Sequence, residues 1–167
     1  MAVTTTFNNT TTTFQFGVNT FTPGNQIFPD VLGLDNGGFA AAYNTASGNF
    51  ILLNFYDANS NQVGGFQIPY DDANTEPPGK PSLTKLANGN VLVVWDDNNP
   101  AESAMLGRIF DQNGNAVGGE LTLSGPSISF EDPVTSALAS GGFAISFTFG
   151  GNIFVGRYNA LGSQLGG

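Results

Sequence analysis

The sequence predicts an all-β fold of three four-stranded antiparallel repeats, each about 52 residues long. One basis is composition, because 23 glycines, 15 phenylalanines and only 10% charged residues are typical of short strands joined by tight turns. A second is a set of landmark residues that recur at a constant spacing. The third is that no long stretch keeps a helical apolar period without a glycine, proline or β-branched interruption.

Three prolines define the spacing. Pro29, Pro81 and Pro133 are 52 residues apart, and each is followed by a leucine five residues on, a glycine eight on, a large apolar residue ten on and an aromatic residue fourteen on. These positions hold Leu34, Leu86 and Leu138; Gly37, Gly89 and Gly141; Phe39, Val91 and Phe143; and Tyr43, Trp95 and Phe147. Their agreement at one period predicts three copies of a single unit.

Each unit is expected to contain four strands. In the first unit, residues 30–34, 39–44, 50–56 and 65–69 alternate or run apolar, and turns rich in Gly, Asn and Ser separate them. The second half of the unit recurs too, because residues 55–65 match residues 109–119 and 157–167. Four strands in about 50 residues is the size of one propeller blade.

The repeat is circularly offset. Residues 66–68 (Phe-Gln-Ile) and 121–123 (Leu-Thr-Leu) follow double glycines as short fourth strands, whereas the third copy stops at Gly166-Gly167. Residues 14–16 (Phe-Gln-Phe) stand as far before Pro29 as residues 66–68 stand before Pro81, so they are the expected missing strand.

Three propeller blades are too few to close a ring, since propellers use about four to eight. One alternative is a three-fold fold that is β-trefoil-like or β-prism-like. The other, which we expect, is strand exchange between chains, giving a six-bladed dimer or an open filament.

The chain divides into an N-terminal arm, residues 1–13, and a single β domain, residues 14–167. The arm is rich in Thr and Asn and precedes the repeat register. It is interpreted either as a strand-donating arm or as a frayed terminus.

Charge and composition exclude several classes of partner and reaction. The chain has 13 acidic and 4 basic residues, a net charge of −9, which opposes phosphate backbones and anionic lipid headgroups. Nucleic acid is therefore not expected as a partner, and membrane insertion is not expected because no uncharged apolar run approaches the roughly 18 residues needed to cross a bilayer. Because Cys and His are both absent, disulfides, thiolate or histidine metal sites and a Ser-His-Asp triad are excluded.

The pattern Pro-x4-Leu-x2-Gly-Gly-Phe-x3-aromatic, followed by aromatic-Asp-x2-Gly-x3-Gly-Gly, resembles the β-repeats of large bacterial exoproteins of the hemolysin or RTX-like group. The resemblance covers nearly everything after residue 13. It implies a bacterial adhesin or surface protein that leaves the cell by type I secretion, in agreement with the absence of a recognisable cleaved signal peptide. The Gly-Gly-x-Gly-x-Asp calcium motifs of that group do not occur here, and Asn159 replaces the Asp in the third copy.

Two Asp-x-Asn-x-Asn runs are candidate metal sites because they place oxygen ligands at alternate positions, as at the start of a calcium loop. They consist of Asp57, Asn59 and Asn61, and of Asp111, Asn113 and Asn115. The later Gly and Glu of an EF-hand are missing, so the expected structure is a hairpin turn with weak calcium binding at most, and no other cofactor is expected.

An acidic loop is the candidate ligand-binding site. It breaks the repeat by its length, and its polar residues are Asp96, Asp97, Asn98, Asn99 and Glu102. Trp95, just before it, could stack on a sugar, but its repeat register predicts a packed structural aromatic instead.

The sequence therefore predicts a protein that is not an enzyme but an extracellular interaction or surface-assembly module. Its expected partners are other copies of itself and, secondarily, carbohydrate or cell-surface material. Two alternatives stay open: a glycoside hydrolase that uses two acidic residues of the loop, and a ligand-free fragment of a longer repeat array.

Overall fold

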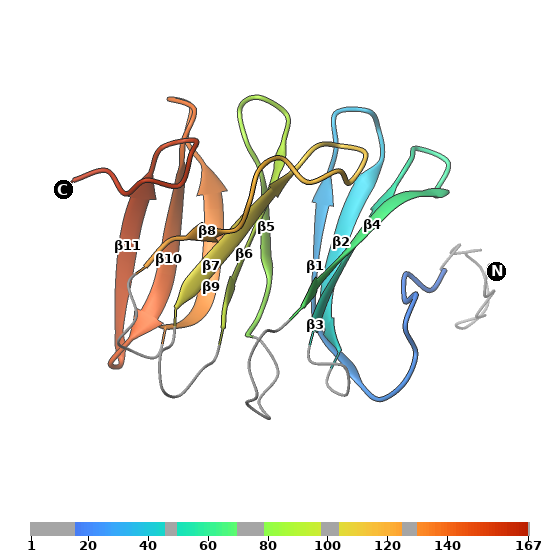
Figure 1. The fold of residues 1–167 in the computed structure, drawn as a ribbon, viewed down its shortest axis with the longest axis horizontal. Helices are drawn as coiled ribbons and strands as arrows, with labels where there is room; N and C mark the ends of the chain where they lie inside the picture. The colour runs from blue at the N-terminus through green and yellow to red at the C-terminus, as the bar shows by residue number, and fades with distance from the viewer. Residues whose placement is uncertain (1–15, 46–49, 70–78, 98–103, 125–129, 167) are drawn as a thin grey trace, which may run out of the picture.

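A computed structural model describes residues 16–45, 50–69, 79–97, 104–124 and 130–166, which form three antiparallel sheets in a row (Figure 1). The first sheet contains β1 (Gln26–Gly33), β2 (Phe39–Thr45), β3 (Phe50–Tyr56) and β4 (Gln62–Pro69). The second contains β5 (Ser82–Lys85), β6 (Val91–Asp96), β7 (Met105–Phe110) and β8 (Leu121–Thr122). The third contains β9 (Phe130–Ala137), β10 (Phe143–Phe149) and β11 (Asn152–Tyr158). The all-β prediction is confirmed, and within the described ranges no helix could span a membrane.

The strands follow one another as meanders because the same tight turn joins the first two strands of each sheet. The backbone N–H of Leu34 donates to the carbonyl of Gly38, and Leu86 and Leu138 make the equivalent bonds to Asn90 and Gly142. The third residue after each leucine is a glycine with a φ of 81°, 85° or 98°, a conformation that L side chains rarely adopt. This requirement explains why a glycine recurs at this point.

Residues 52 apart take the same register in successive sheets. Asp30 pairs with Ala42, Ser82 with Val94, and Val134 with Ser146. Corresponding side chains therefore lie on corresponding faces of the three sheets.

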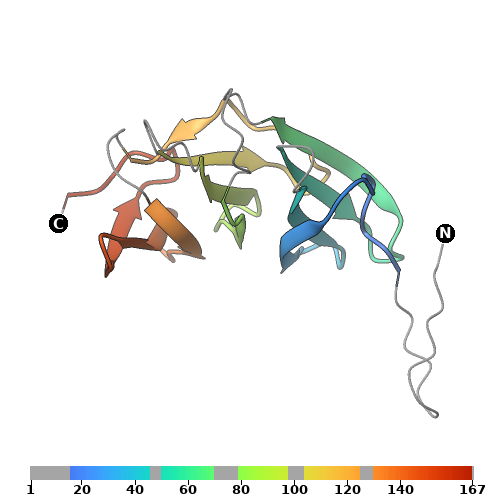
Figure 2. The same cartoon turned by 90° about the horizontal axis from the view of Figure 1, so that it is seen from below.

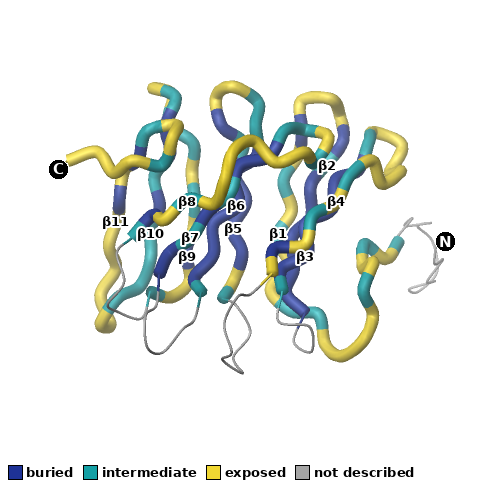
Figure 3. The backbone as a smooth tube through the Cα atoms, viewed as in Figure 1, coloured by how far each residue is buried: buried dark blue, intermediate teal, exposed yellow. Residues whose placement is uncertain are grey.

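The core consists of two layers, one on each side of the second sheet. Alternate residues of β6 contribute to different layers, because successive side chains of a strand point to opposite faces. Val91, Val93 and Trp95 pack against the first sheet, and Leu92 and Val94 pack against the third. Buried residues are concentrated in β2, β3 and the second sheet, whereas much of β11 is exposed (Figure 3).

The sheets fan out along an arc, with β1, β5 and β9 on its concave side (Figure 2). Two matching hydrogen bonds join these inner strands. Asp30 Oδ2 accepts from the N–H of Leu83 at 2.7 Å, and Ser82 Oγ accepts from the N–H of Thr135 at 3.1 Å. The open row differs from the three-fold arrangement of the trefoil or prism alternatives.

Of residues 14–16, the expected fourth strand of the third sheet, only Phe16 is among the described residues. Phe14 and Gln15, like the arm of residues 1–13, lie outside the described residues. Phe16 belongs to no strand, and its ring packs against Phe39 and Tyr56 of the first sheet. The first sheet lies at the end of the row opposite to β11 (Figure 1).

Trp95 is 2% exposed and belongs to the layer between the first two sheets, which confirms its interpretation as a packed aromatic. We expect Trp95→Ala to lower the free energy of unfolding by about 3–5 kcal/mol, because it leaves a large cavity in this layer. Denaturant titration would measure the loss, with Leu161→Ala, at a position 78% exposed, as the control that changes stability little. A loss for Trp95→Ala no larger than the control would contradict this packing role.

Candidate functional site

The first Asp-x-Asn-x-Asn run forms the turn after β3. Asp57 Oδ1 accepts hydrogen bonds from the backbone N–H groups of Asn59 and Asn61, both at 2.8 Å, and Oδ2 accepts from Asn61 Nδ2 at 3.1 Å. These bonds, led by that of the Asn61 side chain, hold the pKa of Asp57 below its usual value. The carboxylate thus serves as the acceptor of its own turn.

The equivalent turns after β7 and β11, one with an aspartate and one with an asparagine, show that the negative charge is not required for this geometry. After β7, Asp111 accepts from the N–H groups of Asn113 and Asn115 and from the Asn115 side chain, which lowers its pKa in the same way. After β11, the neutral Asn159 Oδ1 accepts from the N–H groups of Leu161 and Ser163 at 2.9 and 3.0 Å. An Asx turn needs one oxygen, which Asn and Asp both supply.

The candidate calcium ligands therefore form two separate turns, each bonded within itself. In the part of the chain that the structure describes, no group of three or more Asp, Glu, His or Cys residues is placed to hold a metal ion.

The described part of the acidic loop centres on a buried carboxyl group. Asp96 is the last residue of β6 and is 5% exposed, while Asn98, Asn99 and Glu102 lie outside the described residues. The adjacent Asp97 uses Oδ1 to accept from the N–H of Ala104 at 2.8 Å. Gly79 lies so close to the Asp96 carboxyl that a Cβ at position 79 would overlap it.

Burial raises the pKa of Asp96 to about 7, and the negative charges of Asp97, Asp132 and Glu131 add to the effect. A hydrogen bond from the Gly79 backbone opposes it. The tertiary structure thus brings Glu131 and Asp132 of β9 within electrostatic range of the acidic loop. The sequence pattern did not associate these two residues with the loop. The 52-residue spacing is the signal that could have found Asp132, because it relates this residue to Lys80, which follows Gly79. Lys80 Nζ lies 3.5 Å from Asp132 Oδ1.

The Asp96 carboxyl can exchange a proton near neutral pH, but it lines neither the groove on the first sheet nor the cleft beside β8.

The outer face of the first sheet is partly covered by residues 16–21, which we call the strap. The Val18 carbonyl accepts hydrogen bonds from Asn54 Nδ2 at 2.9 Å, the Tyr56 hydroxyl at 3.2 Å and the Tyr43 hydroxyl at 3.4 Å. The Tyr43 hydroxyl also accepts from the N–H of Thr20 at 3.0 Å. These buried polar side chains obtain their partners from the strap.

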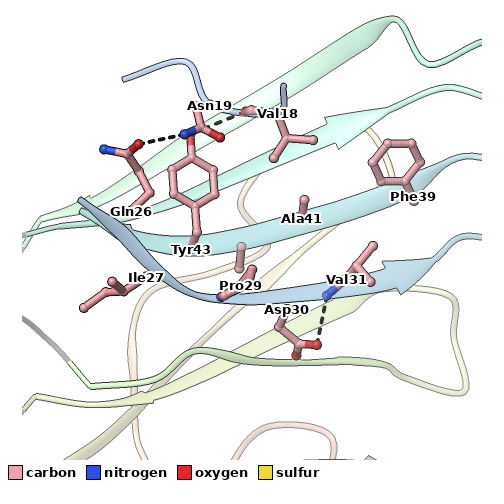
Figure 4. A pocket seen from close by; sticks show the side chains of 11 residues that line it. Val18, Asn19, Gln26, Ile27, Pro29, Asp30, Val31, Phe39, Ala41 and Tyr43 are labelled. Atoms are coloured by element: carbon pink, nitrogen blue, oxygen red, sulfur yellow. Dashed lines mark hydrogen bonds between the residues drawn. The ribbon is translucent and has the colours of Figure 1, made fainter. Parts of the chain in front are cut away.

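Beside the strap, a groove of about 540 Å³ runs along β1 and β2. Figure 4 shows Val31, Phe39, Ala41 and Tyr43 on one side of the sheet, facing Val18 of the strap, whereas Asp30 points to the opposite side. Val31 is 67% exposed, so the groove offers apolar surface at this end of the row.

The far end of the row exposes apolar residues as well. The outward face of the third sheet carries Val134, Ile153 and Val155, which are 58%, 73% and 68% exposed. β-branched residues normally gain stability in strands by packing against neighbours, so this face has the character of an interface.

Comparisons with protein-family models, with curated proteins and with solved structures find no match.

The Asx-turn geometry predicts weak calcium binding at most, with a dissociation constant above about 0.1 mM. Titration calorimetry measures it directly. Asp57→Asn should keep the two backbone hydrogen bonds of the turn, as Asn159 does, and should leave the calorimetric trace unchanged. Micromolar binding that Asp57→Asn abolishes would show that this carboxylate is a ligand.

The raised pKa of Asp96 predicts that stability falls as pH rises. The folded protein binds this proton more tightly than the unfolded chain, so the penalty for ionisation is absent below the unfolded value of 3.8, grows up to about pH 7 and is then constant. At about 1.4 kcal/mol per pKa unit, the total is on the order of 4 kcal/mol at most. Asp96→Asn should therefore flatten the fall in melting temperature between pH 5 and pH 8.

Asp57→Asn is the control for this experiment. Because its lowered pKa places the titration of Asp57 below pH 5, this variant should keep the pH dependence of the parent protein. A parent protein whose melting temperature does not fall over this range would contradict the assignment to Asp96.

Proposed function

We propose that this chain is a non-catalytic interaction module that acts outside the cell and assembles by exchanging a terminal strand between copies. The observation that carries the proposal is the open edge of β11. In the second sheet, β8 pairs with Leu106 and Gly107 of β7. The corresponding stretch of β11, at Phe154 and Val155, has no strand paired to its outer edge among the described residues.

The chain approaches this edge in the same way in both sheets. Val117 donates its N–H to the carbonyl of Ile109 at 2.8 Å, and Leu165 donates to Arg157 at 2.7 Å. In the second sheet the path continues into β8. An edge strand with unpaired backbone groups recruits further strands readily, so a strand from another molecule fits here.

Residues 14–16 are the strand that we assign to this edge. Their sequence, Phe-Gln-Phe, resembles the Phe66-Gln67-Ile68 segment of β4, and their place before Pro29 matches that of β4 before Pro81. Phe16, the last of these residues and the first of the strap, packs against Phe39 and Tyr56 of the first sheet. That sheet lies at the end of the row opposite to β11, so we assign residues 14–16 to the β11 edge of a neighbouring molecule (Figure 1).

Each sheet is then a propeller-type blade, and two chains joined head to tail at both ends form a six-bladed ring. The same contact without closure gives a filament. The arc of the three sheets supports this arrangement because it already curves around β1, β5 and β9 (Figure 2).

The buried position of Asp96 supports a non-catalytic role over the glycoside hydrolase alternative. That alternative requires two carboxyl groups that reach a substrate from both sides. Turnover of any member of a polysaccharide panel, abolished by Asp96→Asn, would contradict the proposal.

The assembly itself is tested by light scattering. We expect the intact chain to form dimers or polymers, and a variant lacking residues 1–17 to be a monomer. A variant lacking only residues 1–13 is the matched control, because it keeps residues 14–16 and should assemble. Gln15→Pro should also weaken assembly, because proline removes a backbone donor while Phe16 remains.

A monomeric intact chain, or unchanged assembly in both the shorter chain and Gln15→Pro, would overturn the proposed strand exchange.

A further inference from the structure

The exposed face of the third sheet corresponds to faces that are buried in the other sheets. By strand register, Val155 occupies the place of Leu53, and Ile153 that of Ile51. Leu53 and Ile51 are fully buried in the layer between the first two sheets. In the described chain, no further sheet covers their counterparts in β11.

The outer face of the first sheet is the counterpart of the surface that receives Leu53. In the second sheet, that surface is formed by Leu83, Val91, Val93 and Trp95. The corresponding residues of the first sheet are Val31, Phe39, Ala41 and Tyr43, and all four line the groove beside the strap (Figure 4). The two ends of the row therefore present the two halves of one kind of junction.

At one position of the inner strands, the contact with the next sheet is a hydrogen bond within the chain but would be apolar between two copies. Inside the chain, Asp30 and Ser82 accept a backbone N–H from the next sheet. The next residue in this series is Val134, whose side chain contains no hydrogen-bond acceptor. Its counterpart in a second copy is Val31, whose N–H already donates to Asp30 Oδ1 at 2.9 Å, so an apolar contact replaces the hydrogen bond without leaving this donor unpaired.

Charge complementarity favours a second copy in the same orientation. The turn after β7 places Gly114 against the ring of Phe55 in the first sheet. Arg157 occupies the place of Phe55 in the third sheet, so the same contact puts this cation beside the Asp57–Asn61 turn of another molecule. The Asp57 pKa is lowered, which keeps this turn negatively charged.

We propose that the outward face of the third sheet, carrying Val134, Ile153 and Val155, docks on the groove face of the first sheet of a second copy. This inference rests on the proposed self-association and specifies its surface, because an exchanged strand occupies only the edge of β11. The occupant is a second copy rather than an unrelated protein, because both halves of the junction are present on this one chain.

Docking displaces the strap, which lies over part of the groove face. The strap begins at Phe16, the last of residues 14–16, so moving those residues to the β11 edge of the partner also draws the strap away from the face. One segment thus covers the acceptor surface in the isolated chain and completes the partner's sheet in the assembled form.

The experiment introduces a charge into one face at a time. Val155→Asp alters the outward face, and Val31→Asp alters the groove face; both positions are exposed, so the isolated chain should keep its fold. Each variant alone should dissociate at least about tenfold more readily, because docking would bury an unpaired carboxylate. Leu161→Asp, at a position 78% exposed in the turn after β11, is the control and should assemble like the parent.

An equimolar mixture of Val155→Asp and Val31→Asp gives the decisive result. Each variant keeps one intact half of the junction, so the mixture should form heterodimers containing one of each chain at a concentration at which each variant alone has dissociated. Light scattering, with one variant mass-tagged, measures this outcome.

The two proposals fail in different ways. A monomeric parent chain would overturn both. If Gln15→Pro abolishes assembly while Val155→Asp leaves it unchanged, strand exchange holds and the docking face is wrong. Loss of assembly in Val155→Asp without recovery in the mixture would also overturn the proposed pairing of these two faces.

Discussion

The burial of the second sheet on both of its faces is the constraint on which the rest of the structure depends. Every residue of β6 is buried, and its alternating side chains contribute to two separate apolar layers. A sheet of this kind is stable only between two others, since exposing either face would return a whole layer of side chains to water. The first and third sheets are held in place by this requirement, and the order of the row follows from it.

The same constraint creates the distinctive features at the ends of the row. Each outer sheet buries one face against the second sheet and has another face without that cover. At one end, the strap covers part of the face in place of a further sheet. Its Val18 carbonyl accepts hydrogen bonds from the side chains of Asn54, Tyr56 and Tyr43. At the other end, Ile153 and Val155 stand in positions that are fully buried elsewhere. The strap thus covers one of these two faces in part, whereas the other face stays exposed among the described residues.

The Asp96 carboxyl is an ionisable group buried within this largely apolar arrangement. Its burial and its negative neighbours raise its pKa to about 7, so its charge changes within the range in which most carboxylates stay ionised. The charged neighbours that contribute to this effect are Asp97, which directly follows β6, and two residues of β9, so the property belongs to the junction of two sheets rather than to the loop alone. The Asx turns show the opposite case, because local hydrogen bonds alone lower the pKa of Asp57 and Asp111.

The sequence by itself determined the local features of this protein. The strand class, the turn glycines at positions 37, 89 and 141, the Asx turns and the core position of Trp95 all follow from residue type and spacing, because each depends on contacts within a few residues or on the alternation of a strand. Spacing also related positions 52 apart, and their strands share one register. Only the tertiary structure decided which faces meet. It placed Glu131 and Asp132 beside Asp96, folded the strap over the first sheet and left Val134, Ile153 and Val155 exposed, since the packing of one sheet on another depends on the curvature of the whole row rather than on any single segment.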